Sequence, residues 1–502
     1  MALPAFRQTL YCYLTMRALI DKKSTFYLLI LCSLGVLASL QNIYILKRIS
    51  FDGLYGQDPY AYYGFSEQLI HFLKGGSFPE PFFWPWGYPT LLALGKSLGL
   101  AAISVNIILF AVVPGIIFLI AKELHLSIFS GLVAAVSIAV SGQMLQSSLL
   151  IMSDIPAVFW CLLSLLFILK YQNKNLFRYL LLSLIFLAFA AITRWLYLLM
   201  IIPWGFFLLS KRVPPKEIFK SALLPGIVII GQILLGKSDK FNAFQHHFFD
   251  NWSFNNFSNH ALKGFEGVTS VAAPNFSFYS DAITDPFWLP QVLLPFVILG
   301  LGFLIWSKNI PTLCIVLPWI LVPYLFFCGL PVQNPRYSLM FFPAISLLVG
   351  LGAESVYKAL SKKVIAGILM LGIGLIGALS NIKSNPDKII AFLEVLNRDK
   401  ETAVWISSNI DNTGTIYAFG ITLTLKHYHP KLKTLELFFE NPTSLAEKTK
   451  SNQPNYLVLD TNVIAEQWTN TPLAKSYAWL NNTPGLTLIG TRYNYSLFRI
   501  NE

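Results

Sequence analysis

The sequence predicts an all-α polytopic bundle of transmembrane helices followed by a small α/β domain outside the membrane. Hydrophobic residues make up 55% of the 502 residues and charged residues 12%, with a mean hydropathy of +0.58, which is typical of membrane proteins. About eleven apolar runs are long enough to cross or nearly cross a bilayer. After residue 380 these runs stop, and short apolar stretches alternate with helical ones.

The first predicted span is Phe26–Leu46, whose length of about 21 residues suits a bilayer and exceeds that of a cleavable signal. Further spans are expected at 103–121, 127–142, 155–170, 177–193, 195–210, 218–236, 287–306, 311–330, 338–357 and 364–380. Several are short, so tilted packing or local thinning of the bilayer is expected. Residues 1–380 form one predicted domain, with outer loops at 47–102 and 237–286.

The positive charges predict the orientation of the chain. The net charge is +12, but the cations form no stripe suited to nucleic acid. About 16 Lys and Arg residues fall in the short loops on the side of the N-terminus, which the positive-inside rule places in the cytoplasm. Counting the run Pro89–Leu100 as a span would reverse this bias, so we expect a re-entrant or interfacial segment there. Residues 381–502 are then extracytoplasmic, at a plasma or inner membrane.

The first outer loop contains a predicted amphipathic helix. Pro59 follows Asp58 and suits a first helical turn, because its fixed φ is helical and its missing N–H is not needed there. Apolar residues then recur on one face at helical spacing, and Gly75 and Gly76 end the run. A helix of this kind between spans lies in the membrane interface. Asp58 is therefore expected at the membrane surface.

This loop carries a resemblance. An Asp near the start of a long first loop, a tyrosine-rich helix and a later W-G-Y-P at 86–89 resemble the GT-C superfamily of polytopic glycosyltransferases. That superfamily includes protein O-mannosyltransferases, aminoarabinose transferases and the bacterial RgtA/B/C/D-like group. The resemblance implies a polyprenyl-phosphate sugar donor, a lipid, glycan or protein acceptor, and catalysis by the first-loop Asp. Protein mannosyltransferases have Asp-Glu where this chain has Asp58-Pro59, so the branch stays open.

Asp58 has two candidate roles. An Asp before Pro is a good helix N-cap. In the GT-C interpretation it is instead the base that takes the proton of the acceptor hydroxyl, in an inverting reaction that needs no covalent intermediate. The phosphate leaving group requires no general acid. The predicted substrate-loop residues around it are Tyr60, Tyr62, Tyr63, Trp86 and Tyr88.

Asp154, in the sequence Met-Ser-Asp-Ile-Pro, opens the fourth predicted span from outside. It is either a helix cap or, because the GT-C superfamily has an acidic residue at the corresponding junction, a second catalytic carboxylate. Two carboxylates in one cavity are able to bind a divalent cation, or one orients the substrate while the other acts as the base. The sequence leaves both roles open.

Two arginines at the outer ends of spans are candidate phosphate ligands. Arg194 interrupts a long apolar run, and a charge at membrane depth needs a partner unless it snorkels to the surface. Arg336 and Tyr337 follow Asn334-Pro335 and resemble an R-Y element that faces the lipid-phosphate pocket in the GT-C superfamily. A guanidinium binds phosphate through two parallel hydrogen bonds.

The second outer loop holds His246, His247 and His260, without regular metal-ligand spacing. Some aminoarabinose transferases hold zinc with a Glu and a His from corresponding loops, which would pair Glu80 with His246 or His247. The sequence favours no metal here, and an interfacial segment at Phe248–Phe257. No cofactor is required by the sequence.

The C-terminal region has apolar runs at 403–406, 415–419, 435–438, 456–459, 486–489 and 495–500, separated by helical stretches near 444–450, 463–468 and 473–480. It contains no phosphate loop, dinucleotide motif or nucleophile elbow. Of the five cysteines, Cys12 precedes the first span and the others fall in spans, so no disulfide framework is implied.

Two other functions fit an outer-facing polytopic protein. An O-antigen ligase or polymerase is expected to centre on a large late outer loop, whereas the acid-bearing first loop is prominent here. A lipid or solute transporter is expected to carry charges deep in several spans and often shows inverted repeats. The notable charges of this chain instead cluster at the outer ends of its spans.

Overall fold

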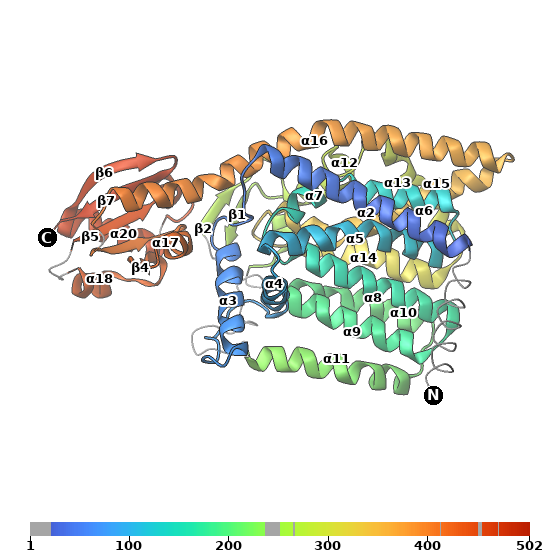
Figure 1. The fold of residues 1–502 in the computed structure, drawn as a ribbon, viewed down its shortest axis with the longest axis horizontal. Coiled ribbons are helices and arrows are strands. Elements are labelled where there is room, and N and C mark those ends of the chain that lie inside the picture. The colour runs from blue at the N-terminus through green and yellow to red at the C-terminus, as the bar shows by residue number, and fades with distance from the viewer. Residues whose placement is uncertain are drawn as a thin grey trace, which may run out of the picture.

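The computed structural model describes residues 22–235, 251–264, 267–411, 413–449, 454–469 and 471–501. Long helices lie side by side in a bundle, and a β-sheet domain lies beyond one end of it (Figure 1). The helices of the first part are α2 (Lys22–Arg48), α3 (Asp58–Leu73), α4 (Gly87–Ser97), α5 (Ala102–Glu123), α6 (Ile128–Ala139), α7 (Gly142–Ser148), α8 (Asp154–Lys174), α9 (Phe177–Thr193), the 3-10 helix η1 (Trp195–Met200), α10 (Ile201–Ser210) and α11 (Pro215–Leu235).

The second part of the bundle begins with short elements of the outer loop and ends in the longest helix. Its elements are η2 (Phe254–Phe257), the antiparallel hairpin β1 (Ala261–Gly264) and β2 (Gly267–Ser270), α12 (Asn275–Thr284), η3 (Gln291–Leu293), α13 (Leu294–Trp306), α14 (Ile310–Cys328), η4 (Pro335–Met340), α15 (Phe342–Ala359) and α16 (Lys363–Ser408).

The bundle agrees with the predicted multi-pass membrane protein. In the described part of the chain, six helices are long and apolar enough to span a bilayer, or seven if the bent pair α6–α7 counts as one span. Shorter apolar helices and α15 occupy the other predicted spans. Helix α4 has 11 residues, too few to cross, which agrees with the interfacial segment predicted there.

The break between α6 and α7 is a bend of 57°, and its exposed backbone groups are hydrogen-bonded by neighbouring elements. The carbonyl of Val140 accepts bonds from the side-chain amides of Asn381 (3.3 Å) and Asn385 (3.2 Å), one turn apart on α16. The amide of Gly142 donates to the carbonyl of Phe287 at 2.7 Å. Because the freed groups keep partners, the broken helix is stable inside the bundle.

Helix α16 is 46 residues long and joins the bundle to the sheet domain. The domain boundary predicted at residue 381 therefore falls inside a continuous helix. The grouping of the apolar run at 403–406 with the runs that form the strands of this domain is wrong, because these residues belong to α16. Thr402, Ala403 and Ile406 are buried at helical spacing, so this apolar run is the helix face that covers the sheet.

The C-terminal domain is a five-stranded sheet in the order β4-β3-β5-β7-β6. Strands β4, β3 and β5 are parallel, while β7 and β6 are antiparallel. The elements after α16 are β3 (Thr415–Ala418), α17 (Thr422–Tyr428), β4 (Lys433–Glu436), η5 (Leu437–Phe439), α18 (Pro442–Lys448), β5 (Asn455–Leu459), α19 (Thr461–Glu466), α20 (Pro472–Leu480), the π-helix η6 (Asn481–Gly485), β6 (Leu486–Arg492) and β7 (Tyr495–Ile500).

Helices cover both faces of this sheet. Ile416 and Ala418 pack with the end of α16 and with α17, whereas Tyr417, between them, packs with α18, α19 and α20. Strands β3 and β5 are buried along their whole length, as expected of parallel strands between two helical layers. The α/β domain predicted from the alternating runs is confirmed.

Candidate active site

Asp154 is the centre of a buried ionic cluster at one end of the bundle. Its Oδ1 accepts a bond from Nη1 of Arg194 at 2.5 Å, and its Oδ2 from Nη1 of Arg336 at 3.3 Å. The Asp154 side chain is 2% exposed, and those of Arg194 and Arg336 are 15% and 17% exposed. Three elements distant in sequence thus bring one carboxylate and two guanidinium groups together, where each charge needs the others.

The backbone before α8 sets the position of Asp154. The side-chain amide of Asn106, buried on α5, donates to the carbonyls of Leu150 (2.6 Å) and Met152 (2.8 Å). The N-cap of α8 is Ser153, and no side chain caps this helix end. The cap role weighed for Asp154 is therefore wrong. Its carboxylate instead accepts hydrogen bonds from Arg194 and Arg336.

Arg194 lies where α9 ends and η1 begins, in extended conformation. The start of α4 packs tightly against this helix end. A Cβ added at Gly87 would lie 2.6 Å from the carbonyl oxygen of Ile192, closer than real contacts allow. The Trp-Gly-Tyr-Pro segment therefore needs glycine there, and the first loop is fixed against the residues that present Arg194. The guanidinium also lies 5.5 Å from the centre of the Tyr337 ring, a cation–π contact.

Arg336 is held by Asn334, two residues before it. The Asn334 Oδ1 accepts from the backbone N–H of Arg336 at 3.1 Å and from its Nε at 3.3 Å. Together with Asp154 these contacts use Nε and Nη1 of the guanidinium. Since a guanidinium carries five N–H donors, Arg336 has the capacity to bind an anion as well. Tyr337 stacks on Phe327 with ring centres 5.0 Å apart.

Asp58 occupies the first turn of α3, whose N-cap is Gln57, and no side chain caps the helix. The cap role weighed for Asp58 is therefore also wrong. The indole of Trp84 hydrogen-bonds its carboxylate. Burial raises the pKa of Asp58, the positive charges of Arg336 and Arg194 oppose that rise, and Asp154 adds to it. Asp58 thus belongs to the same electrostatic cluster as Asp154 and both arginines.

The predicted substrate-loop residues divide into two groups. The Tyr62 hydroxyl is 3.5 Å from Oγ of Ser153, next to Asp154, and Tyr88 packs edge-on against the Tyr62 ring at 5.1 Å. Tyr60 and Tyr63 instead contact His427 of the C-terminal domain, each with ring centres 5.3 Å apart. Trp86, the N-cap of α4, packs against aromatic rings of the same loop, those of Phe65 and Phe78.

Tyr55 is a member of the cluster that the sequence interpretation missed. Burial raises its pKa, and it interacts electrostatically with Arg336, Asp154, Asp58 and Arg194. It lies three residues before Asp58, in a segment whose conformation no sequence motif predicts. The supporting amides of Asn106 and Asn334 were missed for the same reason, since their role depends on contacts made only in the folded chain.

The described residues do not form the zinc site that was considered for Glu80 and the histidines of the second outer loop. Among the described residues, no three His, Cys, Asp or Glu side chains lie close enough to hold a metal. Glu80 is exposed, and its backbone N–H donates to Gln68. His260 is exposed, with Nδ1 3.1 Å from the carbonyl of Val271. His246 and His247 lie outside the described residues.

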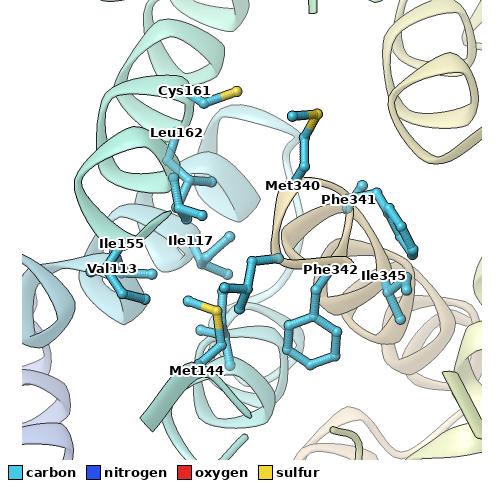
Figure 2. Close-up of a cluster of buried hydrophobic side chains, with 14 of the residues drawn as sticks. Val113, Ile117, Met144, Ile155, Cys161, Leu162, Met340, Phe341, Phe342 and Ile345 are labelled. Atoms are coloured by element: carbon cyan, nitrogen blue, oxygen red, sulfur yellow. The ribbon is translucent and has the colours of Figure 1, made fainter. Parts of the chain in front are cut away.

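An apolar layer closes the bundle beneath the ionic cluster. Figure 2 shows side chains from several helices pointing toward one another, among them Ile155, which follows Asp154, and Met340, at the end of the segment that carries Arg336. Ile155, Met144 and Phe342 are fully buried. The residues that carry Asp154 and Arg336 are thus continuous in the chain with a buried apolar core, and electrostatic interactions are stronger in such surroundings than in water.

Comparison with known proteins shows which fold this chain has. The family model of dolichyl-phosphate-mannose-protein mannosyltransferases matches residues 79–234. The fold is similar to that of ArnT from Cupriavidus metallidurans, at 12% identity over 95% of this chain and 98% of that one. The TM-score is 0.63 for the apo state and 0.62 for the form bound to undecaprenyl phosphate. The chain has the GT-C fold.

A larger GT-C protein gives a weaker match. The arabinofuranosyltransferase AftD from Mycobacteria aligns over 93% of this chain and 40% of its own length, at 12% identity and a TM-score of 0.51. A comparison with curated proteins finds no match for the sequence. The resemblance stated from the first loop is confirmed. In this GT-C fold, the ionic cluster joins Asp154 at the start of α8 to Arg194, just before η1, and to Arg336 in η4.

Proposed function

We propose that this protein is an inverting membrane glycosyltransferase that moves a sugar from a polyprenyl-phosphate donor to an acceptor hydroxyl or amine. The observation that carries the proposal is the pair of arginines, Arg194 and Arg336, that the buried Asp154 carboxylate holds together, with Asp58 electrostatically coupled to both. The similarity of the fold to ArnT, a form of which binds undecaprenyl phosphate, supports a lipid-linked donor. The protein would act on the outer face of the membrane, with its N-terminus in the cytoplasm.

In this mechanism the arginines bind the donor phosphate. Arg336 is pre-oriented by Asn334, and Arg194 by its ion pair with Asp154. As the bond between sugar and phosphate breaks, negative charge grows on the phosphate oxygen, and fixed guanidinium groups stabilise it. Asp154 keeps both arginines in place before the anion arrives.

Asp58 acts as the base. The oxygen or nitrogen of the acceptor attacks the anomeric carbon, its proton passes to the Asp58 carboxylate, and the polyprenyl phosphate leaves with the bonding electrons. A carboxylate whose pKa is raised by burial is a better proton acceptor than an ordinary Asp. The Tyr62 hydroxyl is 3.5 Å from Oγ of Ser153, the residue before Asp154, and Tyr88 packs against the Tyr62 ring.

The decisive experiment replaces Asp58 by Asn in the purified full chain. Its readout is release of polyprenyl phosphate from a panel of polyprenyl-phosphate sugars, in the presence of membrane lipid acceptors. We expect turnover to fall by about 10²–10⁴-fold, because the amide is a far poorer base. Since the Asp58 side chain caps no helix, folding should be unaffected.

Glu67→Gln is the matched control. Glu67 lies on the same helix, is exposed, and pairs with Lys96 at 3.0 Å away from the cluster, so its variant should keep the activity of the parent. Turnover by Asp58→Asn within a few-fold of the Glu67→Gln value would end the assignment of Asp58 as the base. A parent protein that releases no phosphate from any donor of the panel would count against the reaction itself.

A further inference from the structure

The turn that leads into the Asp58 helix is bonded to the C-terminal domain. The N–H of Gly56 donates to Oδ2 of Asp399 at 2.8 Å, and the carbonyl of Gly56 accepts from Oγ1 of Thr424 at 3.3 Å. The Oε1 of Gln57 accepts from the backbone N–H of Leu423 at 3.2 Å. These partners lie more than 340 residues further along the chain, at the end of α16 and the start of α17.

Further contacts flank this turn on both sides. Before it, Asp52 accepts a bond from the Tyr428 hydroxyl at 3.1 Å and lies 3.6 Å from Nζ of Lys400. After it, Tyr60 and Tyr63 pack against the ring of His427. The C-terminal domain therefore contacts the chain immediately before and immediately after Asp58, and α3 lies between the bundle and that domain (Figure 1).

Gly56 needs this support because of its backbone conformation. Its φ is +53°, in the left-handed region, and no atom lies within 4 Å of the place where a Cβ would be. The glycine is thus required for its conformation and not for space. Glycine is also the residue with the greatest freedom in the absence of restraint. The bonds from Asp399 and Thr424 fix both polar groups of this residue, two positions before Asp58.

The placement of Asp58 depends on where α3 begins. Its carboxylate caps no helix, and Trp84 bonds it from the same loop. A shift of about 1 Å in a reacting group can cost on the order of 10²-fold in rate. A restraint on the start of α3 therefore acts directly on the reacting geometry, whereas the phosphate-binding arginines are held by other elements.

We propose that Asp399 is a positioning residue for Asp58, and that the C-terminal domain is through it a working part of the active site. This rests on the proposed function of Asp58 as the base. Loss of the Asp399 bond should lower kcat and leave the affinity for the lipid phosphate unchanged. A merely structural tether would change neither, or would change both through loss of folded protein.

The test uses the purified full chain with Asp399→Ala, Asp399→Asn and the control Glu401→Ala. Asn keeps an oxygen that can accept from the Gly56 N–H. Glu401 lies on the same helix but contacts Arg492 and Tyr493 within the C-terminal domain. Three readouts are measured: hydrogen–deuterium exchange of the segment 52–60, kcat on the donor panel, and the Kd for undecaprenyl phosphate.

For Asp399→Ala we expect faster exchange at 52–60, a kcat lowered by about 10- to 100-fold and an unchanged Kd. Asp399→Asn should restore most of the kcat, and Glu401→Ala should match the parent throughout. An Asp399→Ala protein with the kcat of the parent overturns the proposal, whatever its exchange. So does a kcat loss matched by an equal loss of lipid-phosphate binding.

Thr424→Val gives a second arm that does not depend on the folding of Asp399→Ala. It removes the bond to the Gly56 carbonyl from a different element and should lower kcat in the same direction, with unchanged Kd. Parent-like kcat in Thr424→Val, when Asp399→Ala does not fold, would also overturn the proposal. A parent without turnover is the distinct outcome that removes the proposed function, and the positioning role falls with it.

Discussion

Two groups of ion pairs in this molecule differ in the exposure of their side chains and in the parts of the fold that they join. In the ionic cluster, Asp154 pairs with arginines 40 and 182 residues away in sequence. In the C-terminal domain, Glu440 pairs with Lys448, eight residues away, at 2.6 and 2.7 Å, and Glu401 pairs with Arg492 on the exposed surface. The first group requires the whole bundle to assemble, whereas the Glu440 pair secures a single short helix. Burying several charges carries a large desolvation penalty, so the ionic cluster indicates a functional site and not a contact that only stabilises the fold.

The substitution Asp154→Ala tests this comparison most directly, and we expect it to have the largest effect. It leaves Arg194 and Arg336 buried without their carboxylate, and removing one partner of a buried pair costs about 3–5 kcal/mol. We expect a large drop in the thermal unfolding midpoint of the detergent-solubilised protein, and a smaller one for Asp154→Asn, which keeps its acceptor oxygen. A midpoint equal to that of the parent would show that the cluster is not a coupled unit.

The next largest effect is expected for Arg336 in lipid-phosphate binding. Hydrogen bonds to charged groups contribute about 1.5–3 kcal/mol, so Arg336→Ala should weaken the binding of undecaprenyl phosphate by about 10- to 100-fold. Arg336→Lys keeps the charge but loses the planar fork, and should recover only part of the affinity. The measurement is titration of the lipid phosphate. Lys388→Ala, which removes a cation that contacts the Phe287 ring, serves as control and should bind as the parent does.

The pH dependence of turnover offers a third test. Asp58 must be ionised to accept a proton, so activity is present above its pKa and is lost as the pH falls through it. Because burial raises that pKa, the acid limb of kcat should lie above the range of an ordinary Asp. Asp154→Asn removes a negative neighbour that adds to the rise and should move the limb to lower pH. If the acid limb does not move in this variant, the charge of Asp154 does not influence the pKa of Asp58, which contradicts the proposed coupling.

The smallest effect belongs to the exposed pair. Arg492 and Glu401 are each more than 40% exposed and 3.5 Å apart, and surface pairs of this kind contribute about 0–1 kcal/mol. Arg492→Ala should therefore leave the unfolding midpoint almost unchanged. A drop comparable to that of Asp154→Ala would mean that burial does not distinguish the two groups.

The fold was predictable because its signals are local. Apolar length and the lysine bias define the spans, and alternation defines most of the C-terminal strands. The error at 403–406 shows the limit, since four apolar residues fit a strand or a helix face equally well until the covering sheet is known.

The candidate site was predictable in its charged members and in the tyrosines beside them, Tyr62, Tyr88 and Tyr337. Asp58, Asp154, Arg194 and Arg336 stand out because charges are rare in apolar sequence. That the last three form one ionic cluster depends on the packing of α8, η1 and η4. The helix-cap roles considered for both carboxylates were chemically reasonable, and contacts with distant arginines override them. Tyr55, and Asp399, which accepts a hydrogen bond from the N–H of Gly56, carry no sequence signal at all.

The length of α16 has a mechanical consequence. A helix of 46 residues, with Pro386 inside it, is about 69 Å long at about 1.5 Å per residue, so one continuous helix runs from the bundle into the sheet domain. A tilt of about 5° at its buried end would carry the other end through about 6 Å on this length. A change in bilayer thickness that altered the tilt of this span would displace the domain that contacts the Asp58 turn. The lipid around the protein would then act on the geometry of the reacting groups.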